Sequence, residues 1–129
     1  MIKGFEDVTT KISDYEKERI LPLVVEVLRH RVGAKKAATN KKIREYLQLE
    51  DGIIIDAITM RRIISYIRKN SLVPCLIATS KGYYVAEEEK EINDYLESLQ
   101  GRIEAIRSVS TSLKRQLRKR FGKKKPADS

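Results

Sequence analysis

Residues 56–85 read DAITMRRIISYIRKNSLVPCLIATSKGYYV, and the spacing of their apolar residues changes from helical to extended after Pro74. Between positions 56 and 70 the apolar residues recur every three or four positions, which predicts a helix with one buried face. Asp56 is suited to cap its first turn. The expected buried residues of this helix are Met60, Ile63, Ile64 and Ile67.

The second half of this stretch predicts a β-hairpin. Residues 75–79 and 83–85 are rich in β-branched and aromatic side chains, as strands are. Ser80-Lys81-Gly82 predicts a tight turn between them, because glycine tolerates the positive φ that such turns need. Tyr83 and Tyr84 alternate along the returning strand, so one is expected to face the core and the other outward.

Upstream of this stretch, residues 39–47 predict a shorter helix. Thr39 is a suitable N-cap, and Ile43 and Leu47 are expected to face inward. The β-branched run at residues 53–55 then predicts a brief buried strand just before the helix that begins at Asp56.

Residues 13–32 predict a longer first helix, with Ser13 as its cap and Gly33 as its stop. Pro22 lacks a backbone donor, so we expect a kink or a break between residues 18 and 22. A separate short helix before it would use three apolar residues, Phe5, Val8 and Ile12.

From residue 87 to about residue 120 the pattern is helical again, and its apolar residues alternate in spacings of four and three. This spacing is a heptad seam, with Ser110 filling one gap. Such a seam must be covered by something. We expect a second copy of the chain in a homodimer, or else the chain's own domain if the helix bends back at Gly101. The expected dimer-interface residues are Leu99, Ile103, Ile106, Leu113 and Leu117.

The chain therefore divides into a domain at residues 1–86, a C-terminal helix at 87–120 and a basic tail at 121–129, which we expect to be disordered in isolation. The formal net charge of +9 is spread unevenly. Segment 35–85 carries ten basic and four acidic side chains, segment 114–129 carries eight and one, and the segment between them is acidic. Two basic regions with an acidic one between them favour two separate contacts to a polyanion.

Patterns typical of catalysis or of a bound cofactor do not occur in the sequence. His30 and Cys75 are its only histidine and cysteine, which excludes a structural zinc site and a nucleophile–histidine pair. Phosphate-binding glycine motifs are missing as well. We expect a non-enzymatic protein without cofactor or metal. The single cysteine, the acidic start and the short apolar runs favour a cytoplasmic protein that does not enter a membrane.

The order helix, helix, short strand, helix and hairpin over residues 39–85, with the first helix ahead of it, resembles the winged helix-turn-helix family. The resemblance covers residues 13–86 at most, and residues 76–85 stand in the place of the family's wing. The chain also resembles small winged-helix proteins of bacterial phages and mobile elements. The implied fold is mainly α with a small β-hairpin, followed by the long C-terminal helix.

The resemblance implies a protein that binds double-stranded DNA. The third helix enters the major groove and the wing contacts the backbone. Arg61, Arg62 and Ser65 then become the candidates that read bases. The other expected DNA-binding residues, mainly for phosphates, are Lys41, Lys42, Arg44, Arg68, Lys69 and Lys81.

Three functional readings remain open at this point. The first is a DNA-binding protein that associates with the nucleoid, as a transcriptional regulator or as a phage or plasmid replication factor. The second is a protein–protein interaction module that uses the winged helix and the heptad helix. The third is an RNA-binding protein, for which the basic tail would suffice.

Overall fold

The structure is a computed structural model, and it describes residues 11–122. The chain divides into two compact units, Met1–Ile92 and Asn93–Ser129. The short helix expected around Phe5 and Val8, and the basic tail beyond Gly122, lie outside the described residues.

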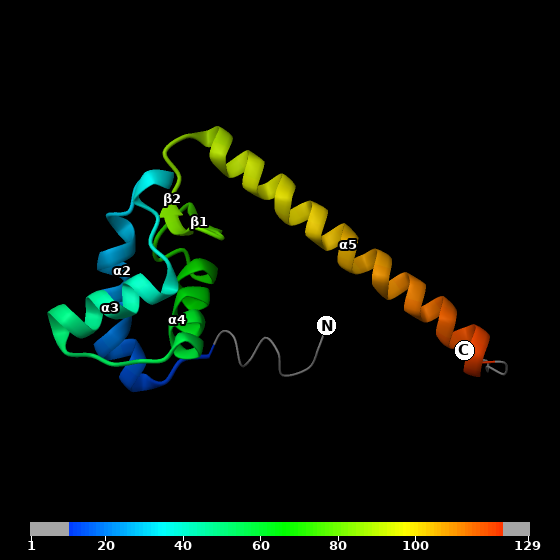
Figure 1. Ribbon diagram of the computed structural model, residues 1–129, viewed down its shortest axis with the longest axis horizontal. Coiled ribbons are helices and arrows are strands. Elements are labelled where there is room, and N and C mark those ends of the chain that lie inside the picture. The colour runs from blue at the N-terminus through cyan, green and yellow to red at the C-terminus, as the bar shows by residue number, and fades with distance from the viewer. Residues whose placement is uncertain (1–10, 123–129) are drawn as a thin grey trace. The chain divides into compact units, whose positions relative to one another are not determined.

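The described chain is mainly helical, with a small two-stranded antiparallel sheet (Figure 1). This agrees with the mainly α class and the hairpin expected from the sequence. The elements in chain order are η1 (Glu16–Ile20), α2 (Leu21–Arg29), η2 (Ala34–Lys36), α3 (Asn40–Asp51), α4 (Ala57–Lys69), β1 (Leu76–Thr79), β2 (Gly82–Val85) and α5 (Glu89–Phe121).

The first helix begins as predicted, with a capping box. The backbone N–H of Ser13 donates to Glu16 Oε1 at 2.9 Å, and the N–H of Glu16 donates to Ser13 Oγ at 3.1 Å. The irregularity expected near Pro22 takes the form of a π-helical turn, η1, which runs directly into α2 without a break. Pro22 is the second residue of α2, directly after the π-helical turn, so the irregularity coincides with the residue that lacks a backbone donor.

The expected end of this helix at residue 32 is wrong, because α2 ends at Arg29. Val32 instead forms a parallel bridge with Val85 of β2, and the N–H of Val85 donates to the carbonyl of Arg31 at 2.7 Å. The chain has to leave the helix early in order to reach the hairpin. Gly33 follows with a φ of +94° and turns the chain toward η2.

The cap of α3 is confirmed, since Thr39 Oγ1 accepts from the backbone N–H of Lys42 at 3.1 Å. The helix runs four residues beyond the predicted end and stops at Gly52, which adopts the left-handed conformation with φ of +66°. Ile43 and Leu47 are buried, as expected.

The strand expected at residues 53–55 is wrong, because this run is the extended connection from α3 to α4 and pairs with no strand. Besides Val32, it is Ala38 that forms a bridge with the hairpin. Its N–H donates to Tyr83 O at 3.0 Å, and the N–H of Tyr83 donates to Ala38 O at 2.8 Å. The β-branched run has strand propensity but no strand alongside it, and pairing requires both.

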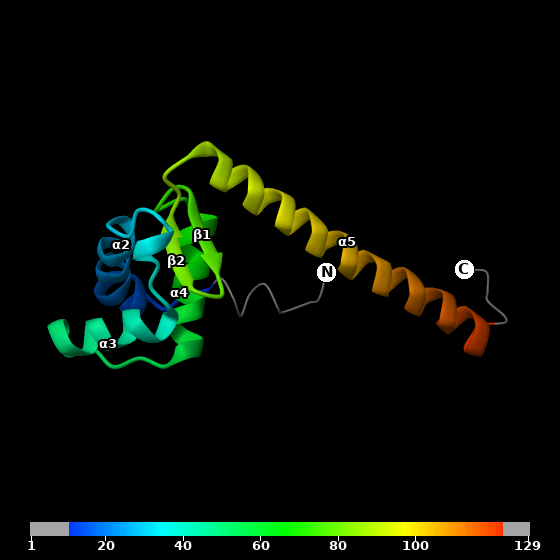
Figure 2. The ribbon, with the colours of Figure 1, turned by 45° about the horizontal axis from the view of Figure 1, so that its top comes forward.

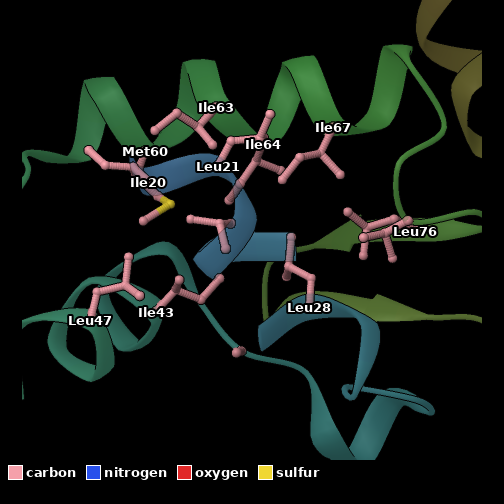
Figure 3. Close-up of a cluster of buried hydrophobic side chains, with 13 residues drawn as sticks. Ile20, Leu21, Leu28, Ile43, Leu47, Met60, Ile63, Ile64, Ile67 and Leu76 are labelled. Atoms are coloured by element: carbon pink, nitrogen blue, oxygen red, sulfur yellow. The ribbon is translucent and has the colours of Figure 1, made fainter. Parts of the chain in front are cut away.

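The helix α4 confirms both its predicted cap and its predicted buried face. Asp56 Oδ1 accepts from the N–H of Thr59 at 2.7 Å. All four expected core residues of α4 are buried, and they lie on the side of the helix that faces α2 and α3 (Figure 3). Together with side chains of α2, α3 and β1 they form one core, which includes Val24, Leu28, Ile43, Leu47 and Leu76.

The hairpin is confirmed, with a turn of two residues, Ser80 and Lys81, between Thr79 and Gly82 (Figure 2). Gly82 has the positive φ expected of it, +123°. The expectation that Cys75 is a strand residue is wrong. Cys75 is exposed, has a φ of +61° and lies one residue before β1, so it belongs to the turn that follows α4.

The returning strand differs from the expected pattern of one tyrosine inward and one outward. Tyr83 packs against the core, but Tyr84 is also half-buried. Burial raises the pKa of Tyr84, and the negative charge of Glu91 adds to the rise. The second ring is therefore partly covered by the protein itself.

Taken by itself, α5 is one continuous helix of 33 residues (Figure 1). It begins two residues later than expected, because Glu87 and Glu88 donate their backbone N–H groups to the side chain of Glu91. None of the residues from Glu89 to Phe121 is buried. Within residues 11–122, a helix long and apolar enough to cross a membrane is not found.

Candidate nucleic-acid interface

The outer face of α4 carries a stripe of side chains at spacings of three, four and three residues, namely Ile58, Arg61, Ser65 and Arg68. Arg61 and Arg68 are exposed, and Ser65 is half-exposed. Ile58 is 62% exposed, which is unusual for an isoleucine on a helix with an ample apolar face. This stripe lies away from the four buried residues, so it can meet another molecule without disturbing the core.

Ile58 was not among the base-contacting residues predicted from the sequence. The signal was available, because Ile58 precedes Arg61 by three residues and Ser65 by seven, and therefore shares their face of the helix. An isoleucine at this position offers an apolar contact beside the polar ones.

Arg62 does not have the outward placement expected of it. Its Nη1 donates to the carbonyl of Lys11 at 3.1 Å and to Glu16 Oε1 at 3.3 Å, and its Nη2 donates to Thr59 Oγ1 at 3.3 Å. Its side chain is only 25% exposed. Successive helical residues point about 100° apart, so Arg61 faces outward while Arg62 turns toward the start of the first helix. The protein's own chain holds the Arg62 guanidinium.

The start of α3 lies against the start of α4. Asn40 Nδ2 donates to the carbonyl of Ala57 at 3.1 Å. Lys41 and Lys42 are exposed in the first turn of α3, as expected. The contact therefore brings these two lysines close to the first turn of α4.

Arg44 has a different position from the outward one expected. It is half-buried, and its Nε donates to Asn40 Oδ1 at 2.6 Å. The guanidinium therefore orients the amide that joins the two helices, so we describe Arg44 as a residue that positions α3 against α4.

The tip of the hairpin lies beside the segment that leads into α3. A side chain at Gly82 would come within 2.5 Å of the Ala38 backbone and 2.7 Å of Thr39 N, so only glycine fits there. Lys81 is exposed at this tip and lines a small hollow together with Lys35 of η2. Lys35 is not among the DNA-binding residues expected from the sequence. Its proximity to Lys81 depends on the pairing of Ala38 with Tyr83, which no local pattern indicates.

We call Lys35, Lys41, Lys42, Arg61 and Lys81 the basic surface. Two acidic residues lie next to it: Asp56 at the cap of α4, and exposed Glu45, which follows Lys41 by four residues on α3. The hydrogen bonds from Thr59 hold the pKa of the Asp56 carboxyl below its usual value, and the charges of Arg62 and Arg44 lower it further. This carboxylate is engaged in the helix cap through its hydrogen bond from Thr59.

The remaining candidates occupy other positions. Lys69 is exposed in the last turn of α4. His30 is the C-cap residue of α2, where it and Arg29 bond to Glu26. The bond from Arg29, followed by that from His30, lowers the pKa of Glu26 to about 2. Among the described residues, histidine, cysteine and carboxylate side chains do not gather in threes as a metal site would need.

The five residues expected at a dimer interface all lie on α5. Four of them are clearly exposed in the single chain, and Leu99 is half-exposed. Ala105, Val109 and Phe121 add further apolar side chains to the surface of the same helix.

Comparison with protein-family models, with curated proteins and with solved structures finds no match for this chain.

Proposed function

We propose that this chain is a non-enzymatic protein that binds duplex DNA through a winged-helix unit. In this proposal α4 lies in the major groove, and the β1–β2 hairpin contacts the backbone. The role in the cell would be that of a transcriptional regulator or of a phage or plasmid replication factor, bound to the nucleoid.

The order of elements supports the winged-helix assignment. Three helices, α2, α3 and α4, share one core with β1, and the hairpin follows directly after α4. The segment between α2 and α3 makes isolated bridges to β2 at both Val32 and Ala38, which hold the hairpin against the helices. The predicted short strand lay between the second and third helices, whereas the bridging segment lies between the first and second and makes two isolated bridges. This position still suits a hairpin anchored on the helices.

The observation that carries the proposal is that two contacts link three exposed basic elements. Gly82 abuts the backbone at Ala38 and Thr39, which joins the hairpin tip to the start of α3. The Asn40–Ala57 hydrogen bond then joins the start of α3 to the start of α4. The five residues of the basic surface lie on these three elements and on η2. Positive charge arranged around a helix that has an exposed polar stripe favours a nucleic-acid partner.

The stripe on α4 offers suitable chemistry for base readout. An arginine can donate two hydrogen bonds to guanine O6 and N7, which makes Arg61 the principal candidate. Ser65 can donate or accept one turn further on. Ile58 can contact a thymine methyl group, in the way that apolar side chains do in the major groove.

The proposal can be tested by selecting bound duplexes from a random pool with the full chain. Readout by α4 is supported if the natural protein enriches a sequence motif and Arg61→Ala loses this enrichment. The variant should also bind the selected duplex more weakly, by about 1–3 kcal/mol. Arg19→Ala is the matched control. Arg19 is also an exposed arginine, but it lines a hollow with Asp51 at the far end of α3. No enrichment, together with equal losses in the two variants, would contradict a specific reader.

A protein-interaction module is the second candidate, and one observation favours it. Ile54 is 77% exposed and precedes the exposed Ile58 by four residues, and Leu49, near the end of α3, is 82% exposed. Such side chains are typical of contact surfaces for proteins when they form a patch. If Ile54→Gln abolishes capture of a partner protein while duplex binding stays unchanged, this second function is supported. Competition by structured RNA tests the RNA-binding alternative in the same assay.

We also propose that the protein acts as a homodimer through α5. A helix whose apolar seam has no buried residue within the chain exposes a hydrophobic surface that a second helix can cover. Two copies of the DNA-binding unit would then act together on one duplex.

A further inference from the structure

The charges of α5 are divided unequally between its two halves. Residues 89–104 carry five acidic and two basic side chains, whereas residues 105–121 carry six basic and none acidic. The helix dipole favours this distribution in a single helix. This unequal charge distribution also determines whether two copies of α5 can pair in a parallel or an antiparallel orientation.

The seam assigns each apolar residue to a heptad position. Leu96, Ile103, Ser110 and Leu117 fall at a, and Ile92, Leu99, Ile106 and Leu113 fall at d. The same repeat places Glu89 at a and Arg120 at d, at the two ends of the helix. The outermost layers of the seam are therefore charged, with opposite signs at the two ends.

In a parallel, in-register pair, each residue of the seam meets its own copy. Glu89 would face Glu89 of the partner subunit, and Arg120 would face the partner's Arg120. Arg102 and Arg107, at positions g and e, would also be neighbours across the pair, which adds two further repulsive contacts. The six basic side chains in the second half of each helix would lie next to one another.

In an antiparallel pair, a positions face d positions, and one alignment satisfies the whole seam. Glu89 then faces the partner's Arg120, so both ends carry opposite charges. The facing residues between these ends are Ile92 with Leu117, Leu96 with Leu113, Leu99 with Ser110, and Ile103 with Ile106. The acidic half of each helix lies along the basic half of the other.

We infer that α5 pairs in the antiparallel direction with α5 of a second copy, in the register that sets Glu89 opposite Arg120. This inference rests on the proposed homodimer and adds its direction and register. The alignment overlaps the two helices along almost their full 33 residues, a length of about 50 Å. Because each DNA-binding unit precedes the start of its own α5, the two units are joined to opposite ends of the helix pair.

The distance between two spin labels tests the direction. A full-length protein with Cys75→Ser and Lys119→Cys carries one label on each chain, on the outer side of α5. In the antiparallel pair Lys119 lies level with the partner's Lys90, so the labels are about 45 Å apart. In a parallel pair they lie at the same level, at about 20 Å or less. A dimer with the short distance would overturn the antiparallel arrangement.

A charge exchange tests the register independently of labels. Arg120→Glu should raise the dimer dissociation constant on the order of tenfold, because it sets two glutamates against each other at both ends. Adding Glu89→Arg to that variant should restore dimerisation. Arg115→Glu, which removes the same charge at the outward f position, is the matched control and should change the constant by about twofold or less.

Sedimentation equilibrium on the same proteins tests the homodimer and its register separately. A full-length protein that stays monomeric at all concentrations would overturn the homodimer and, with it, this inference. A dimer that ignores the charge exchange would overturn the register alone. Duplex binding by the α4 stripe is measured separately with Arg61→Ala, and neither of these outcomes affects it.

Discussion

Arg62 of α4 donates a hydrogen bond across 3.3 Å to Glu16, a residue 46 positions earlier that also completes the capping box of the first helix. One carboxylate oxygen thus serves the start of one helix and the flank of another. The adjacent Arg61 takes no part in this contact and is exposed. Two arginines that are indistinguishable in the sequence therefore have separate roles, one structural and one available to a ligand.

Separate replacement of these two arginines should show this division. Arg62→Ala removes three hydrogen bonds from a partly covered site, so the free energy of unfolding should fall by about 1–2 kcal/mol. Arg61→Ala, at an exposed position, should change it by less than about 0.5 kcal/mol. Urea unfolding measures both values. Equal stability of the two variants would show that the Arg62–Glu16 contact does not hold the first helix to α4.

The close approach at Gly82 predicts a strong effect of a small substitution. Gly82→Ala adds a Cβ that would meet the Ala38 backbone at 2.5 Å, at a φ of +123° that alanine rarely adopts. The free energy of unfolding should fall by more than about 1 kcal/mol, and duplex binding should weaken because the hairpin tip shifts. Gly101→Ala is the control. A Cβ added at Gly101 would meet no atom within 4 Å, and Gly101 lies inside a helix. Alanine is favoured over glycine there, so the free energy of unfolding should rise by up to about 1 kcal/mol.

The cap at Asp56 predicts a specific pH dependence. The pKa of this carboxyl is lower in the folded protein than in the unfolded chain, mainly because Thr59 donates hydrogen bonds to it. Its stabilising contribution is therefore complete above the unfolded pKa and is lost as the pH falls through the folded one. Asp56→Asn keeps a good N-cap but removes the titration.

The comparison of these two proteins is best made by thermal unfolding from pH 6 down to about pH 2. The stability advantage of the natural protein over Asp56→Asn should shrink as the pH drops below about 4. Glu26, whose pKa is about 2, titrates in both proteins, so its effect cancels. An advantage that stays constant with pH would mean that the carboxylate charge contributes nothing to the cap.

Duplex binding should depend steeply on salt. If about six phosphates are neutralised, the logarithm of the binding constant should fall with the logarithm of salt concentration with a slope of about −5. Lys35→Ala and Lys81→Ala should each reduce the magnitude of the slope by about one, because each removes one phosphate contact. Fluorescence anisotropy with a labelled duplex measures these slopes. If the slope is unchanged in both variants, the hairpin tip does not contact the duplex.

Local features of the fold could be predicted from the sequence alone. The caps at Ser13, Thr39 and Asp56, the buried face of α4 and the presence of a tight turn in the hairpin all depend on side chains within a few positions of each other. Such contacts form between neighbours in the chain, so spacing and residue type are sufficient to indicate them.

The tertiary structure decided what depends on segments distant in the sequence. It directed Arg62 to Glu16, paired Ala38 rather than residues 53–55 with the hairpin, and brought Lys35 next to Lys81. Strand pairing needs a partner strand as well as a propensity, and the direction of a side chain around a helix matters only once another element lies beside it. Sequence therefore determined the elements and their inner faces, and packing determined which charged side chains remain for a ligand.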